Sequence, residues 1–366
     1  MIDAFRTLSQ QPLPLPLFFP DATRGVVRLL DNQDLISTHT PGILVNAYHL
    51  WREIPPHRID KLGGIRGLMN WSGAVISDSG GFQVMSLAKR KGQFGRVDDE
   101  GVWFKPENGT KLLLTPEISI DYQLSLGTDL VIALDDFTPP TALQAEATDT
   151  VERTVAWAKR SKTAFDLGCD RRGIPHSQRP YLTGVVQGGY FPALRAECAH
   201  QLAEIGFDGF GYGGWPITAA GEFDRQSAQI IAEHSPPGYF LYGLGIGKPE
   251  NIVECAHLGY QIFDCVLPTR DARHGRLYVY NAASISDIDV QKPDFYSYYV
   301  PSKAIHLESD VPISNACDCH TCTHYSRAYL AHLFRTKDAT AWRLATIHNL
   351  RFYSLLMEKL RNTSTT

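Results

Sequence analysis

From about residue 180 onward, short apolar runs alternate with segments of helical spacing, and this alternation restricts the fold more than any other feature of the chain. The apolar runs predict strands over 182–187, 207–213, 239–245 and 261–268. The intervening segments predict helices over 192–206, 222–234 and 249–259, and the first and last of these begin at a proline and close at a glycine. Strands and helices that alternate with short loops are typical of a parallel sheet or barrel.

The same pattern occurs earlier in the chain. GAVISD (73–78) and DLVIALDD (129–136) predict two further buried strands, and a long helix is expected over 141–166. The segment VWFKPENGTKLLLT (102–115) looks inserted, because its alternating runs flank a hairpin turn at Asn108–Gly109.

Three of the seven cysteines lie within six residues, in CDCHTC. Their C-x-C-x2-C spacing allows Cys317, Cys319 and Cys322 to point at one ion, and Zn²⁺ prefers four nitrogen or sulfur ligands. The candidates for the fourth ligand are His320, His324, His332 and His348. The first two are sterically awkward so close to the thiolates, whereas His348 belongs to an amphipathic helix that could fold back over the loop. Four protein ligands around zinc indicate a structural site.

A chain of 366 residues accommodates one large barrel with additions. We therefore predict an α/β fold, namely a (β/α)8 TIM barrel with an inserted β-hairpin region and a C-terminal zinc-binding helical subdomain. The expected division is an N-terminal lead-in over 1–45, a barrel core over 46–280, and the zinc-binding subdomain with the C-terminal helices over 281–366.

Composition excludes several classes of protein. The net charge of −4 argues against a surface that is basic all over and binds nucleic acid everywhere. No segment approaches the roughly 18 consecutive apolar residues that a membrane span needs. The first ten residues, MIDAFRTLSQ, lack the apolar stretch of a secretory signal peptide. We therefore expect a cytoplasmic protein with no membrane partner.

Polar or glycine-rich positions recur where the predicted strands end. They are Asp78, Asp135, Gln187, Gly213–Gly214, Gly245–Gly247 and Asp264. In a TIM barrel the carboxyl ends of the strands meet on one face, where the active site lies. A single aspartate at a strand end is explained as well by a helix cap. The recurrence at several strand ends favours a site on that face.

Two segments carry groups suited to chemistry on a glycosylated base. In SDSGGFQVMS (77–86), two glycines permit close backbone approach to a planar ligand, Phe82 is placed to stack on it, and Asp78 could act as acid or base. Taken alone, a glycine turn without a ligand explains this segment equally well. In FDCVLPTRDARHGR (263–276), Asp264 ends an apolar strand and three arginines follow at intervals of three.

A carboxylate can attack the anomeric carbon of a sugar and form a covalent glycosyl intermediate. Arg270, Arg273 and Arg276 would hold phosphates around such a centre. The combination predicts glycosyl transfer on a nucleotide or a nucleic acid.

At these residues the chain resembles the tRNA-guanine transglycosylases, also called queuine tRNA-ribosyltransferases, of the bacterial type. The matching stretches are NAYHL (46–50), KLGGIRGLMNWSGAVISDSGGFQVMSL (61–87), LTPEISIDYQLSLGTDLVIALDDFTP (114–139), GVVQGG (184–189), LAEIGFDGFGYGG (202–214), GLGIGKP (243–249), FDCVLPTR (263–270), and CDCHTC followed by SRAYLAHL and IHNL. They cover most of residues 46–360, and several are long and specific.

The resemblance implies a zinc-containing TIM barrel that exchanges guanine at position 34 of a tRNA anticodon for a 7-deazaguanine of the queuosine pathway. Asp264 matches the nucleophile that attacks C1′ of the target ribose, and Asp78 matches the acid/base group. The positions that match base-binding residues are Ser79, Phe82, Asp135, Gln187, Gly214 and Leu244. Those that match RNA-binding residues are Lys248, Arg270 and Arg273. The zinc ligands match Cys317, Cys319, Cys322 and His348, with one structural zinc per subunit of a homodimer.

The chain departs from the family pattern in four places. The region before NAYHL looks shortened, and 281–316 differs from the usual basic stretch. A run from Trp215 to Glu222 stands where the bacterial pattern has small residues ending in glutamate, and Phe137 stands where it has a cysteine. Because Trp215 and Phe137 add bulk to the wall beside the 7-substituent, we hypothesise a base preference other than the usual aminomethyl precursor.

Two alternatives belong to other functional classes. One is a relative of the same fold that inserts a deazapurine into DNA or another RNA, although the retained Arg270 and Arg273 favour tRNA. The other is a non-catalytic subunit that binds a base or RNA. A protein that only binds has no need of a carboxylate nucleophile, and Asp78 and Asp264 are both retained.

Overall fold

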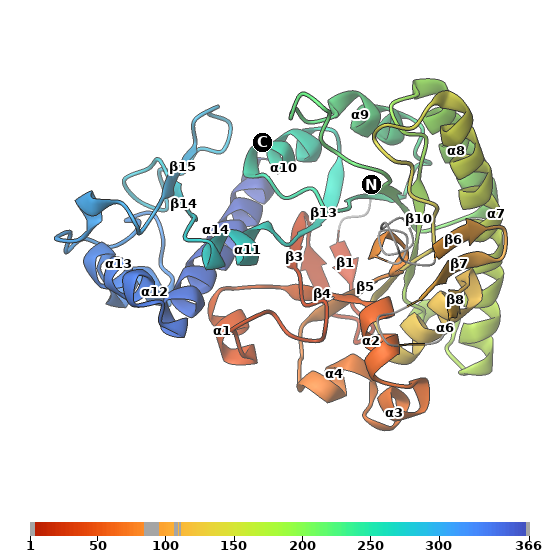
Figure 1. Cartoon of the computed structure of the whole chain (residues 1–366), viewed down its shortest axis with the longest axis horizontal. Coiled ribbons are helices and arrows are strands. Elements are labelled where there is room, and N and C mark those ends of the chain that lie inside the picture. The colour runs from red at the N-terminus through yellow and green to blue at the C-terminus, as the bar shows by residue number, and fades with distance from the viewer. Residues whose placement is uncertain (1–3, 84–94, 106–108, 110, 364–366) are drawn as a thin grey trace.

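The computed structural model describes residues 4–83, 95–105, 109 and 111–363. Its central feature is a parallel sheet of eight strands rolled into a barrel (Figure 1). In chain order the strands are β3 (Leu17–Pro20), β4 (Gly42–Asn46), β5 (Ala74–Asp78), β9 (Leu130–Ile132), β10 (Tyr181–Val186), β11 (Gly209–Tyr212), β12 (Phe240–Gly243) and β13 (Tyr260–Cys265). They pair in the order β3-β13-β12-β11-β10-β9-β5-β4, and a parallel bridge between Asp21 and Leu44 joins the two edges. The predicted (β/α)8 barrel is confirmed.

Helices surround the barrel strands, as Figure 1 shows for the longer ones. In chain order they are α1 (Asn32–Ser37), α2 (Ala47–Glu53), α3 (Pro56–Lys61), α4 (Gly64–Met69), α6 (Pro116–Leu126), α7 (Gln144–Arg171), the short η1 (His176–Gln178), α8 (Pro192–Ile205), α9 (Arg225–Glu233), α10 (Pro249–His257) and α11 (Leu267–Arg273). Helix α8 begins at Pro192 and ends before Gly206, whose φ of +88° favours glycine. No helix in the described ranges is long and apolar enough to cross a membrane.

The barrel begins earlier in the chain than the sequence predicts. The expected lead-in over 1–45 contains β3 and all but the last residue of β4, so the first barrel strand starts at Leu17 and not at residue 46 or later. All four residues of β3 are buried, and a strand buried on both faces carries no alternating pattern. Pro16 and Pro20 also make the segment look like a proline-stiffened stretch without regular pairing.

A hairpin closes the barrel at the end where the strands begin. It consists of β1 (Ala4–Arg6) paired antiparallel with β2 (Pro12–Pro14). The Phe5 side chain is fully buried, with its ring centroid 6.0 Å from that of Phe19 and 5.2 Å from that of Tyr181. The segment expected to be a simple lead-in therefore contributes to the barrel interior.

The predicted insertion is a small antiparallel sheet. Its strands are β6 (Gly95–Asp98), β7 (Gly101–Phe104) and β8 (Leu112–Leu114). It packs beside α2, where the ring centroids of Phe104 and Tyr48 lie 5.2 Å apart. The expected turn at Asn108–Gly109 lies partly outside the described residues, because Asn108 is not among them.

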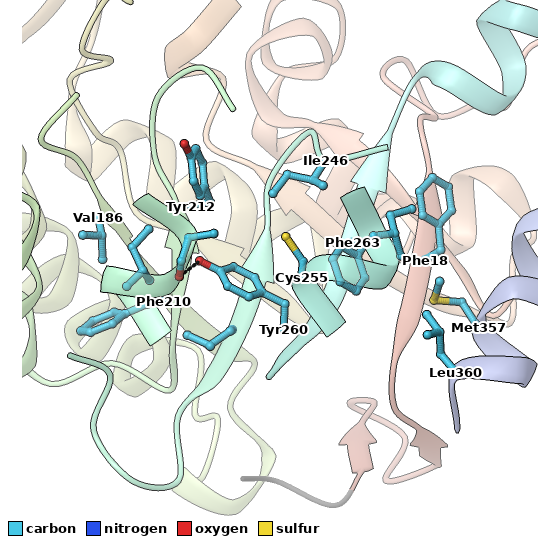
Figure 2. Close-up of a cluster of buried hydrophobic side chains, with 14 of the residues drawn as sticks. Phe18, Val186, Phe210, Tyr212, Ile246, Cys255, Tyr260, Phe263, Met357 and Leu360 are labelled. Atoms are coloured by element: carbon cyan, nitrogen blue, oxygen red, sulfur yellow. Dashed lines mark hydrogen bonds between the residues drawn. The ribbon is translucent and has the colours of Figure 1, made fainter. Parts of the chain in front are cut away.

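The C-terminal region contains β14 (Leu277–Tyr280) paired with β15 (Tyr296–Tyr299), the short η2 (Ala304–His306), and the helices α12 (His320–His324), α13 (Arg327–Thr336) and α14 (Ala339–Thr363). Figure 2 shows Met357 and Leu360 of α14 beside Phe18 of β3 and near Phe263 of β13, within the main buried cluster. The C-terminal helical region is thus present, and its last helix also covers the outside of the barrel.

Candidate active site and metal centre

Apolar side chains fill the barrel interior at alternate positions along the strands. They include Leu17, Phe19, Leu44, Ala74, Ile76, Val185, Phe240, Tyr242 and Ile262. Because successive side chains of a strand point to opposite faces, the next inward position of each strand lies at the rim. On six of the eight strands these rim positions are Asp21, Asn46, Asp78, Gln187, Leu244 and Asp264. A mainly polar layer therefore covers the interior at the end where the active sites of such barrels lie.

Asp264, the predicted nucleophile, lies near the end of β13 and is partly exposed at the rim. Its Oδ1 accepts a hydrogen bond from the backbone N–H of Gly245 at 3.1 Å. Burial raises the pKa of Asp264 to about 7, whereas the Gly245 N–H and the Tyr242 hydroxyl lower this pKa and the charge of Asp78 raises it. The Tyr242 ring is fully buried, yet its hydroxyl lies near Asp264 without a hydrogen bond of ordinary geometry among the described residues.

Asp78, the predicted acid/base group, is the last residue of β5. Its Oδ2 accepts a hydrogen bond from Nδ2 of Asn46 at 2.8 Å, and its Oδ1 accepts one from the backbone N–H of Gly80 at 3.3 Å. Burial raises the pKa of Asp78, although these hydrogen bonds lower it. A raised pKa favours the protonated form, which a general acid requires.

Asp135 and Gln187 form a fixed polar pair on the opposite side of the rim from β3. Nε2 of Gln187 donates to Oδ2 of Asp135 at 2.6 Å, and Oε1 of Gln187 accepts from the backbone N–H of Thr138 at 3.2 Å. Burial raises the pKa of Asp135 to about 7, while the Gln187 hydrogen bond lowers it. The pair presents both an acceptor and a remaining amide donor to the mouth of the barrel.

A buried arginine holds the loops on either side of this pair. Arg195 of α8 is 1% exposed and donates to the carbonyls of Val186 at 2.9 Å and Gly213 at 3.1 Å. Its Nη2 also donates to the Gly189 carbonyl at 2.7 Å. The glycine-rich strand ends that the sequence associates with a site are thereby fixed to one helix.

Three aromatic rings form a wall at the mouth. The Phe82 ring lies edge-on to that of Phe137, with 5.1 Å between centroids. It is nearly parallel to the Trp215 ring, with 6.4 Å between centroids and 26° between planes. Phe82 is 43% exposed and Trp215 is 49% exposed, so both rings are open to a ligand. The structure therefore brings together the two residues whose bulk the sequence predicts in the pocket wall.

The other predicted base contacts occupy different environments. Ser79 is buried, and its Oγ accepts from the Gly81 N–H at 3.3 Å, so its hydroxyl shapes the glycine turn. Leu244 follows β12, is partly buried, and packs on the interior apolar cluster. Gly214 has a φ of +93°, which favours glycine at this bend before Trp215.

The predicted RNA-binding cations lie on the same face. Arg270 and Arg273 belong to α11, which starts two residues after β13. Burial and the neighbouring charges of Arg28 and Arg270 lower the pKa of Arg273, whereas the charge of Asp21 raises it. Lys248 is exposed at the start of α10, in the loop that follows β12.

The metal centre combines three cysteines and one histidine, all of them buried. The ligand atoms of Cys317, Cys319, Cys322 and His348 lie within 4.8 Å of one another. Nδ1 of His348 is 3.2 Å from Sγ of Cys322 and 3.7 Å from Sγ of Cys319. A tetrahedral zinc ion places such atoms about 3.5–3.8 Å apart. The donor set therefore fits a metal ion.

The surroundings of the cluster orient its ligands. Nε2 of His348 donates to the Tyr278 carbonyl at 2.7 Å, which turns Nδ1 toward the sulfur atoms. The exposed His320 and His324 do not take part in the cluster. The next residue of α14, Asn349, donates to the Pro268 carbonyl at 3.0 Å and so links the metal centre to α11.

Comparison with known proteins assigns the chain to a family. A sequence profile described as queuine tRNA-ribosyltransferase matches residues 4–363. The chain belongs to the queuine tRNA-ribosyltransferase family. A queuine tRNA-ribosyltransferase of Pseudoalteromonas translucida is 38% identical over 352 residues, which cover 95% of this chain and 85% of the relative. Another, from Shewanella oneidensis, is 39% identical over 351 residues, which cover 94% of this chain and 86% of the relative.

Three residues that lie at or support the rim of this member of the queuine tRNA-ribosyltransferase family are not predicted from the sequence. Asn46 opens the NAYHL stretch, and its Oδ1 also accepts from the His49 N–H at 3.1 Å as the cap of α2. Tyr242 stands two positions before Leu244, so the period of the strand places both on the inner face. Nothing local distinguishes Arg195 from a solvent-exposed helical arginine.

Proposed function

We propose that this chain exchanges guanine at position 34 of a tRNA anticodon for a 7-deazaguanine, through a covalent intermediate between Asp264 and the ribose. The observation that carries the proposal is the convergence of Asp78 and Asp264 at one barrel rim, with the Asp135–Gln187 pair opposite. An anticodon loop can present an unstacked base to such a mouth, which a paired duplex cannot do without disruption.

The chemistry follows from the state of the two carboxyls. The Asp264 carboxylate attacks C1′ as the bond from C1′ to N9 of guanine breaks, and protonated Asp78 gives its proton to the departing base. The incoming base then gives its N9 proton to Asp78, and N9 attacks C1′ to release the Asp264 carboxylate. Each acid or base is restored, so the exchange needs neither an oxidant nor water.

Base recognition rests on the pair across the rim. The Asp135 carboxylate can accept from the N–H groups of a guanine edge, while Gln187 keeps one amide N–H for the base carbonyl. Phe82 and Leu244 would sandwich the ring, and the Gly214 backbone would border it. Arg270, Arg273 and Lys248 would contact the phosphates of the anticodon loop.

We further propose that Cys317, Cys319, Cys322 and His348 hold one structural zinc ion per subunit. The three thiolates and one imidazole suit this metal, and no fifth position is needed because a structural site is closed. Zinc supplies stability to the C-terminal region, and none of the exchange chemistry uses it. The cytoplasmic location, which the sequence composition suggests, and the homodimer, which the resemblance implies, stay predictions.

Release of labelled guanine from tRNA tests the proposed reaction. Purified protein should release radiolabelled guanine from tRNA on addition of a 7-deazaguanine. Duplex DNA carrying labelled guanine should release none, because its bases are stacked and paired. Release from DNA alone would instead favour the relative that modifies DNA.

The incoming base should differ from the usual aminomethyl precursor. Trp215 and Phe137 add aromatic surface where the resemblance places the 7-substituent, so we expect aminomethyl, cyano and queuine bases to displace guanine in an altered order. Replacing Trp215 by leucine should change the relative rates at which these bases displace guanine by about tenfold. The exchange of labelled for unlabelled guanine is the internal control, because guanine has no 7-substituent. A normal preference for the aminomethyl base would contradict the hypothesis.

Exchange should depend steeply on pH near neutrality. Asp264 attacks only when ionised, and burial raises its pKa to about 7, so kcat/KM should rise as the pH increases through this value. Asp78, whose pKa burial also raises, must be protonated, so the rate should fall again at higher pH. The two apparent pKa values will belong to the interacting carboxyls together. Guanine release measured from pH ~5.5 to ~9 gives the profile, and a flat profile across neutrality would refute this assignment.

A further inference from the structure

Asp21 lies at the rim without a role in the reaction described above. It follows β3, whose inward side chains are Leu17 and Phe19. The strand period therefore turns Asp21 to the inner face of the barrel, one inward position beyond Phe19. The parallel bridge of Asp21 with Leu44, where the barrel closes, fixes its backbone in this position.

Strand order places Asp21 between the two reacting carboxyls. Strand β3 pairs with β13, where Phe19 lies opposite Asp264, and the closing bridge connects it to β4. Strand β4 in turn pairs with β5, where Asn46 lies opposite Asp78. Around the rim the order is thus Asp264, Asp21, Asn46 and Asp78. In agreement, the charge of Asp21 raises the pKa of both Asp78 and Asp264.

One oxygen of the Asp21 carboxylate is fixed by hydrogen bonds, and the other is available to a ligand. Its Oδ1 accepts from the backbone N–H of Thr23 at 3.1 Å and from the Thr23 hydroxyl. Its Oδ2 accepts no hydrogen bond from the part of the chain that the structure describes, and Asp21 forms no ion pair there. The buried Tyr242 hydroxyl near Asp264 is a second polar group whose hydrogen bonding the described residues do not complete. On this side of the mouth, Oδ2 of Asp21 and the Tyr242 hydroxyl can therefore form hydrogen bonds with a ligand.

The position of the base decides which part of a nucleotide can reach Asp21. Asp135 and Gln187 follow β9 and β10, across the barrel from β3. A base bound there, with C1′ at Asp264, directs the sugar toward β3 and β4. A carboxylate repels a phosphate but accepts strongly from a hydroxyl. The hydroxyl on the carbon next to C1′ is the ribose 2′-OH, which distinguishes RNA from DNA.

We propose that Asp21 is a specificity-determining residue whose Oδ2 accepts a hydrogen bond from the 2′-hydroxyl of the target ribose. The inference rests on the proposed exchange reaction and adds a reason for its selectivity for RNA. With a deoxyribose at the target position, the carboxylate would face a C–H group and lose this partner. Hydrogen bonds to the corresponding hydroxyl of other glycosyl-transfer substrates strengthen in the transition state.

The test combines two proteins with two substrates. The substrates are an anticodon stem-loop RNA and the same RNA with a single 2′-deoxyguanosine at the target position. Wild type should lose about 10- to 100-fold in kcat/KM for guanine release on the deoxy substrate, as expected for one hydrogen bond to a charged group. Asp21→Ala should show a similar loss on the all-ribose RNA and little further loss on the deoxy substrate.

Asp21→Asn serves as the matched variant, because its side-chain oxygen can still accept from Thr23 and keep the turn. It should retain the fold and show reduced discrimination between the two substrates. Unchanged discrimination in both variants would overturn the inference while leaving the exchange reaction intact. Absence of guanine release by wild type from the all-ribose RNA would instead refute the proposed function, and the inference with it.

Discussion

Replacing Asp264 by asparagine should lower guanine exchange by at least about 10⁴-fold, because an amide cannot serve as the nucleophile. The substitution keeps the shape of the side chain, and the amide oxygen can still accept from the Gly245 N–H. Burial disfavours the charged form of Asp264, so a neutral amide should not unfold the protein. Wild type incubated with tRNA should form a covalent protein–RNA adduct that survives denaturing electrophoresis, and Asp264→Asn should form none.

Asp208 offers a control at the other end of the barrel. Asp208 directly precedes β11, far from the rim. Its carboxylate accepts a hydrogen bond from the Leu182 N–H at 2.7 Å. Asp208→Asn should therefore leave the exchange rate of the folded protein within a few-fold of wild type. Undiminished exchange by Asp264→Asn would revive the alternative in which this chain only binds a base or RNA.

Removing the metal should destabilise the C-terminal region by several kcal/mol, because binding to a structural zinc site contributes about 10–16 kcal/mol in small zinc domains. The effect should extend to the barrel, since Met357 and Leu360 of α14 belong to its main apolar cluster. It should also loosen α11, which Asn349 holds through the Pro268 carbonyl. Chelation followed by thermal unfolding, circular dichroism and tRNA binding would show these losses together.

Histidine variants identify the fourth ligand. His348→Ala should reduce the metal content from one zinc per chain, whereas His324→Ala should leave it unchanged, because His324 is exposed and outside the cluster. Metal analysis and a thermal melting curve of each variant would test this prediction. A metal-free protein that keeps its fold and tRNA binding but loses only the exchange step would contradict a structural role for zinc.

Several elements could be predicted because their signals are local. Pro192 and Gly206 delimit α8 within one stretch of chain, and the three cysteines of the metal centre lie within one short segment. The strand ends at Asp78 and Asp264 also follow from apolar runs that stop at a carboxylate. The sequence predicts a strand over 129–136, whereas β9 ends at Ile132, and the Asp135 carboxylate that follows accepts a hydrogen bond from Gln187.

Other features depend on partners far away in the chain. Strand β3 is a four-residue run that follows one proline and ends at another, and only its pairing with β13, about 240 residues later, makes it a barrel strand. The hydrogen bond from Asn46 to Asp78 exists because β4 and β5 pair in a register that sets these residues side by side. The C-terminal half of α14 covers the barrel for a similar reason, since its apolar face needs the surface that β3 exposes.

Local patterns in the sequence predict the alternation of strands and helices, the carboxylates at the strand ends and the cysteine ligands, because each pattern repeats or closes within a few residues. Only the folded chain shows where the barrel closes, which face of each strand turns inward and which groups meet at the rim. Those outcomes depend on strand register and on hydrogen bonds between distant segments, which no local period encodes. Asp21 illustrates the difference, because it is an ordinary loop residue in sequence and lies between Asp264 and Asp78 only after the barrel has closed.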